Sequence, residues 1–129
     1  MRKLVYLIVM IPAVALAMHS FNEGDGATWD CGKDPKVAIN TSDSKYTFTG
    51  ACELITNNGS NNKLTIESVK QLTINGGNTD ATIGTLGKTT INGNDNKVVY
   101  TKAASGKKAG LQSNGNNNSL KQQEPAKGK

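Results

Sequence analysis

The sequence predicts an all-β protein, a short parallel β-solenoid (a right- or left-handed β-helix) of about four to five rungs. Two observations support this fold class: Asn-Gly recurs at a fixed spacing, and alternating apolar residues recur at the same phase after each Asn-Gly. A third is that no segment after residue 17 has the period of a helix of any length. Antiparallel hairpin or meander β-structure is the alternative, because Asn-Gly also favours two-residue hairpin turns.

The Asn-Gly pair stands at residues 58–59, 75–76, 92–93 and 114–115. The first three pairs are 17 residues apart, and the last follows after 22, as if five residues were inserted. A fixed period of about 20 residues is typical of a stacked array of repeats. Asn and Gly both accept φ > 0, so each pair predicts a turn.

When the sequence is written in rows of 17 residues, similar residues align in columns. Two columns contain identical polar residues: Thr56, Thr73 and Thr90 in one, and Asn58, Asn75 and Asn92 in the other. A β-meander does not require such columns, whereas a coil in which each row stacks on the last row does. We therefore expect these side chains to form ladders along the solenoid.

Period-two alternation predicts the side chains that face the core. They are Leu64, Ile66, Val69, Leu72, Ile74, Ile83, Leu86, Ile91 and Val98. Lys88 is predicted to lie outside. The earlier residues Tyr46, Phe48 and Cys52 fit the same scheme with a register slip of one residue.

The start of the chain is typical of a secretory signal peptide. Arg2 and Lys3 precede an uncharged apolar run, and Ala15 and Ala17 supply the small residues of a cleavage site after Ala17. An uncleaved anchor is the alternative, but a spanning helix needs about 20 apolar residues. A lipoprotein is disfavoured because no Cys stands at the end of the run. We expect an exported chain (periplasmic, cell-surface or secreted) with no transmembrane segment after cleavage.

The predicted organisation has five parts. They are a signal peptide at 1–17, an N-terminal linker or cap at 18–30, a β-repeat domain at 31–100, a degenerate last turn and C-terminal cap at 101–120, and a disordered basic tail at 121–129. Loss of Arg2 and Lys3 reduces the 15 basic residues to 13 against 10 acidic ones, a net charge of +3. Most of this excess lies after residue 100, where a solubilising tail is the simplest interpretation.

Cys31 and Cys52 are the two cysteines of the chain. An even count in an exported chain predicts a disulfide. In a reducing compartment the two residues would instead pack as small apolar side chains. Metal binding has little support, because His19 is the one histidine and stands beside the predicted cleavage point.

Several segments resemble the bacterial domain of unknown function 3060, whose members repeat a valine/threonine strand followed by Gly-Ser-x-Asn. The segments are Leu64-Thr65-Ile66, Leu72-Thr73-Ile74-Asn75-Gly76, Ile91-Asn92-Gly93-Asn94-Asp95-Asn96-Lys97-Val98 and Ser113-Asn114-Gly115-Asn116-Asn117-Asn118-Ser119-Leu120, together with Cys52. The resemblance covers residues 30–120. Asn-rich turns such as Asn58-Gly59-Ser60-Asn61 replace the family's Gly-Ser-Gly-Asn turns. The resemblance implies an exported repeat domain and carries no catalytic residue.

Enzymatic chemistry requires functional groups that converge. The acidic residues of the repeats are Asp43, Glu53, Glu67, Asp80 and Asp95, which fall in different columns of the 17-residue rows. Paired carboxylates are thus not indicated, and Ser60 and Ser68 lack a histidine partner. We predict no catalytic residue, no cofactor and no enzyme, with an enzyme that has an unrecognised site as an alternative.

Three binding chemistries compete for the repeats. Residues 76–83 resemble the turn of a calcium-binding β-roll, and Asp80 would be the acidic ligand. Calcium needs several such oxygen ligands, but Lys63 and Lys97 occupy the position of Asp80 in the neighbouring rows. A flat array of threonine side chains on one face of a solenoid can bind ice. A face that presents Asn and Thr side chains can bind glycans. We predict no metal site, and a structural or binding role at the cell envelope. Its partner is unknown, with envelope polysaccharide or another envelope protein favoured over specific nucleic acid.

Overall fold

The computed structural model describes residues 18–22, 26–106 and 108–123, which form strands and turns with no helix. The strands are β1 (His19–Phe21), β2 (Gly26–Asp30), β3 (Lys36–Ile39), β4 (Lys45–Asn57), β5 (Lys63–Ile74), β6 (Asp80–Ile91), β7 (Lys97–Ala103), β8 (Gly110–Ser113) and β9 (Ser119–Gln122). Every strand pair among them is parallel. The predicted parallel β-solenoid is confirmed, with about six turns, and the hairpin alternative is excluded.

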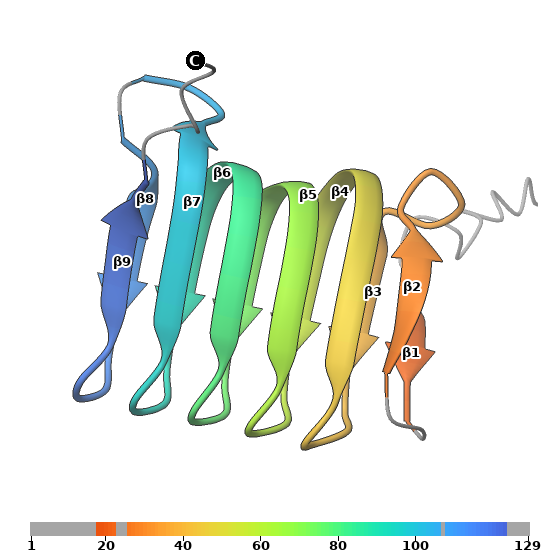
Figure 1. Cartoon of the computed structure of the whole chain (residues 1–129), viewed down its shortest axis with the longest axis horizontal. Helices are drawn as coiled ribbons and strands as arrows, with labels where there is room; N and C mark the ends of the chain where they lie inside the picture. Colours follow the sequence, from red (N-terminus) through yellow and green to blue (C-terminus); the bar gives the residue numbers. More distant parts are fainter. Residues whose placement is uncertain (1–17, 23–25, 107, 124–129) are drawn as a thin grey trace, which may run out of the picture.

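Each turn of the coil contributes one segment to each of two walls (Figure 1). The long strands β4, β5 and β6 bend near their middle, so each belongs to both walls. The first wall contains β2, the first halves of β4, β5 and β6, then β7 and β9. The second wall contains β1, β3, the second halves of β4, β5 and β6, then β8.

The core lies between the walls and consists of stacked columns of side chains. All nine residues that the alternation predicts to face inward are buried. Ile66 pairs with Ile83, and Val69 pairs with Leu86, one rung apart. Lys88 is exposed, as predicted. Each rung therefore covers the apolar side chains of its neighbours, which is how a repeat too small to bury its own core becomes stable.

The register slip expected near Tyr46 is a β-bulge in β4. The pairing of β4 with β5 shifts between Phe48 and Ala51, so two residues of β4 lie opposite one residue of β5. Gly50 lies in this bulge with φ 80°. The bulge adds one residue to the rung, and that extra residue hides the repeat in a strict 17-residue alignment.

The longer interval before Asn114 comes from a loop at the bend of the next rung. Ala103 of β7 pairs with Leu86, and Gly110 of β8 pairs with Lys88. The sequence thus has six residues between these two positions, where β6 has Gly87 alone. The loop is tied to the core by the Ala109 N–H, which donates to Tyr100 Oη at 3.0 Å.

The Asn-Gly turns are built differently from the sequence expectation. Positive φ is found two residues after the glycine of each pair, at Asn61, Asn78, Asp95 and Asn117, and at the equivalent Asp43 of the preceding rung. The glycines of the pairs serve close stacking instead. A Cβ on Gly76 would collide with the carbonyl oxygen of Gly59, and one on Gly93 would collide with that of Gly76.

The strands continue on both sides of residues 31–100, because β1 and β2 precede this range and β8 and β9 follow it. The predicted signal peptide, residues 1–17, lies outside the described residues, and so do residues 124–129 of the predicted tail. Among the described residues there is no helix of the length and apolarity that a membrane span requires.

Candidate functional site

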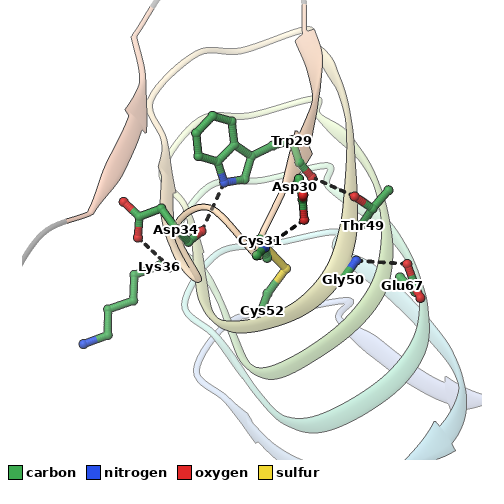
Figure 2. The surroundings of a disulfide bond; sticks show 10 residues. Trp29, Asp30, Cys31, Asp34, Lys36, Thr49, Gly50, Cys52 and Glu67 are labelled. Carbon is green, nitrogen blue, oxygen red and sulfur yellow. Dashed lines mark hydrogen bonds between the residues drawn. A yellow bond between two sulfur atoms is a disulfide. The ribbon is translucent and has the colours of Figure 1, made fainter.

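The disulfide lies at the bend of the coil and joins two adjacent rungs (Figure 2). Cys31 and Cys52 are bonded, with Cα atoms 5.1 Å apart, and both side chains are buried. Cys52 pairs with Val69 in the next rung, so the disulfide occupies an inward column of the core. The predicted disulfide is confirmed, and it indicates an oxidising, non-cytosolic environment.

Hydrogen bonds hold the backbone around the disulfide. The Cys31 N–H donates to the Thr49 carbonyl at 2.9 Å, and the Gly50 N–H in the bulge donates to Glu67 Oε1 at 2.9 Å. The Trp29 indole N–H donates to the Asp34 carbonyl at 3.1 Å, and its ring packs against the core (Figure 2). The Glu67 carboxylate therefore supports the bulge, and the Trp29 indole holds the turn backbone at Asp34.

An asparagine ladder runs along one edge of the solenoid. It consists of Asn22, Asn40, Asn58, Asn75, Asn92 and Asn114. In every step the side-chain Nδ2 of the later residue donates to the Oδ1 of the earlier one, over 2.6–2.9 Å. These side chains are exposed. The column predicted from Asn58, Asn75 and Asn92 is confirmed and extends over six turns.

A second polar array lies inside the same turns. Asn62, Thr79 and Asn96 are buried at 1% exposure each. Asn62 Oδ1 accepts from the Ser44 N–H at 3.0 Å, and Asn96 Oδ1 accepts from the Thr79 N–H at 2.8 Å. These amides satisfy buried backbone groups at the turn. Their role is structural.

The acidic residues do not converge, but the expectation of five separate columns was wrong. Asp43 and Asp95 share the positive-φ column of the turns, with Asn61 and Asn78 between them. The bulge in β4 hides this equivalence in rows of 17.

Asp80 pairs with Lys63 on one side and Lys97 on the other. In the described ranges, no group of three or more His, Cys, Asp and Glu side chains could hold a metal ion.

Two threonine columns stand on the outer faces of the walls. Thr56, Thr73 and Thr90 pair in adjacent rungs on the second wall and are half-buried. The first wall has the more exposed column. Its members, in adjacent rungs, are Thr28, Thr47, Thr65 and Thr82.

Rows of 17 residues align Thr65 with Thr82, but they do not reveal Thr28 and Thr47. Asn22 and Asn40 of the ladder were missed for the same reason. Their rungs precede the bulge and are spaced by 18 residues, and Thr41 replaces the glycine of Asn-Gly. An alignment that allowed one inserted residue could have found Asn40 and Thr47, and further insertions are needed to find Asn22 and Thr28.

A comparison of the chain with protein-family models found no match, and neither did comparisons with curated proteins and with solved structures.

Proposed function

We propose that this protein is an exported, non-enzymatic binding protein of the cell envelope, and that the outer face of its first wall binds a polysaccharide. One observation carries the proposal: Thr28, Thr47, Thr65 and Thr82 form an exposed rank in adjacent rungs. Adjacent rungs are about 4.8 Å apart. The face thus repeats the same hydroxyl group at short, regular intervals.

A repeating polar face suits a repeating polar polymer. Each threonine hydroxyl can donate and accept a hydrogen bond, as a sugar hydroxyl does. A polymer that contacts several rungs at once gains affinity from each further contact, because later contacts form within one complex. Exposed Lys45 and Lys63 flank the rank together with exposed Asp80 and Glu67, so the face presents charges of both signs and suits a polar polymer without a high net charge.

The proposal of export combines two observations. The disulfide between Cys31 and Cys52 indicates an oxidising compartment. Residues 1–17 have the charge and apolar pattern of a signal peptide. Membership of the domain of unknown function 3060 family would agree with this location. Intact-mass measurement of the exported product should show a chain that starts at Met18, whereas a chain that keeps Met1 in the membrane fraction would contradict export and processing.

Binding is tested with the purified exported product on an array of glycans and isolated envelope components. The variant T47V/T65V/T82V removes three hydroxyls of the first wall and keeps side-chain shape. Loss of their hydrogen bonds should weaken glycan binding by about tenfold or more. The matched control T56V/T73V/T90V changes the second wall and should bind like the parent. Equal loss in both variants, or no glycan bound by the parent, would contradict the proposal.

A further inference from the structure

Both ends of the solenoid terminate in strands with one unpaired edge. Within the described residues, β1 pairs only with β3 and β2 only with β4 at one end. At the other end β8 pairs only with β6 and β9 only with β7. Figure 1 shows these strands as the outermost members of the stack. Unpaired edges of this kind are templates for a further strand.

The two ends match each other in register. The column that begins at His19 continues through Val37, Ile55, Leu72 and Thr89 to Leu111. Each wall also contains the same number of segments, because β1 and β8 close the second wall as β2 and β9 close the first. A second copy placed on the C-terminal end would therefore continue both walls in one step, with parallel strands throughout.

The asparagine ladder has a direction that also matches. Asn22 Oδ1 accepts from Asn40, and its Nδ2 donors point to no partner among the described residues. Asn114 Nδ2 donates to Asn92, and no described donor reaches its Oδ1. The free donor of one copy thus meets the free acceptor of another only in a head-to-tail arrangement. A head-to-head contact would bring two donors or two acceptors together.

Each end carries one exposed large hydrophobic side chain, and the C-terminal end is basic. In the described residues the exposed large hydrophobic side chains are Met18, 38% exposed, and Leu111, 48% exposed, at opposite ends of the stack. Among the described residues, Lys102, Lys108 and Lys121 lie at the C-terminal end with no acid, whereas β2 at the other end contains Asp30 and no Lys or Arg. Association of these ends buries apolar surface and brings opposite charges together.

We propose that this chain assembles head to tail with further copies of itself, the edges of β8 and β9 pairing with β1 and β2 of the next molecule. Such a contact joins two different surfaces and does not close on itself, so it produces a filament that continues the solenoid. The proposal is independent of the polysaccharide site, because the outer face of the first wall stays exposed in the filament.

Engineered cysteines test the arrangement. Ser20 and Gln112 are exposed and occupy one column of the second wall, so head-to-tail pairing places them side by side. Mild oxidation of S20C/Q112C should give a ladder of dimers, trimers and higher species on a non-reducing gel. The single variants S20C and Q112C are matched controls and should stay monomeric under the same oxidation.

Sedimentation velocity of the processed product gives the second measurement. The average mass should rise with protein concentration and fall with added salt, and L111K should remove the concentration dependence. Leu111 is exposed, so this variant should keep the circular dichroism spectrum of the parent. A monomer at every concentration overturns the proposal, and so does a Q112C single variant that forms dimers as readily as the pair forms its ladder.

Discussion

Asn75 both donates a hydrogen bond to Asn58 and accepts one from Asn92, each over 2.8 Å and each across one rung of the solenoid. The amide is suited to this double role because it contains a donor and an acceptor on one planar group. The hydrogen bonds of this ladder connect each turn of the coil to the next, at the position where the backbone leaves a wall and enters the loop.

Replacing Asn75 with Ala should lower the free energy of unfolding by about 1–2 kcal/mol, because two hydrogen bonds are lost. Asn75→Asp should cost less than Asn75→Ala, since the carboxylate still accepts from Asn92 but donates nothing to Asn58. Urea unfolding monitored by circular dichroism measures both. Lys70→Ala, an exposed change in β5, is the control and should lie within about 0.5 kcal/mol of the parent. Parent-like stability of Asn75→Ala would show that the ladder contributes nothing.

Gly76 should not tolerate a side chain. A Cβ at this position meets the carbonyl oxygen of Gly59, a backbone atom that can move only if the rungs separate. We expect Gly76→Ala to destabilise the protein by about 1–3 kcal/mol. Gly110→Ala is the matched control, because its Cβ would meet only the Lys88 side chain at 3.6 Å. Equal thermal midpoints for the two variants would contradict the close-stacking role.

Thr89 offers a stabilising substitution. Its side chain is fully buried between Leu72 and Leu111 of the neighbouring rungs, and its Oγ1 is the one buried side-chain polar atom without a partner in the described part of the chain. Thr89→Val keeps the shape and removes the unsatisfied hydroxyl. It should raise the free energy of unfolding by about 1 kcal/mol. Thr90→Val, on the outer face, should leave the unfolding midpoint nearly unchanged, and a destabilised Thr89→Val would reveal a partner for the hydroxyl.

The disulfide should contribute about 3 kcal/mol, because it closes a loop of about 20 residues in the unfolded chain. The double variant C31A/C52A removes it without leaving a free thiol. Its urea midpoint should fall relative to the oxidised parent and approach that of the reduced parent. Two titratable thiols in the denatured, unreduced protein would instead show that the bond does not form.

The core assignment is tested at Ile74, whose side chain is fully buried in the fourth described turn of the coil. Ile74→Asp buries an unpaired charge and should abolish cooperative unfolding. Gln71→Asp, three residues earlier in β5 and exposed, is the matched control, and Lys88→Ala is a second one. Both should unfold cooperatively near the midpoint of the parent. A cooperative Ile74→Asp would mean that this side chain does not face the core.

The amino-acid pattern determined the features that repeat. Alternation in Leu64 and Ile66, or in Leu72 and Ile74, is a local property that fixes which side of a strand is apolar. The recurrence of Asn58, Asn75 and Asn92 at one interval indicated stacked parallel rungs, because only stacking brings residues 17 apart into contact. The disulfide followed from the count of two cysteines in a chain with an export pattern.

Tertiary structure decided what departs from the repeat. The extra residue beside Gly50 and the insertion before Gly110 shift the spacing, so strand pairing decides the register of the rungs before and after them. Pairing then placed Thr28 and Thr47 beside Thr65, and Asp43 in the column of Asp95. It also assigned positive φ to Asn61 rather than to Gly59, whose carbonyl packs against the next rung. The physical reason is that a sequence specifies local periodicity, whereas contacts between rungs depend on how each irregularity is absorbed at a bend or a turn.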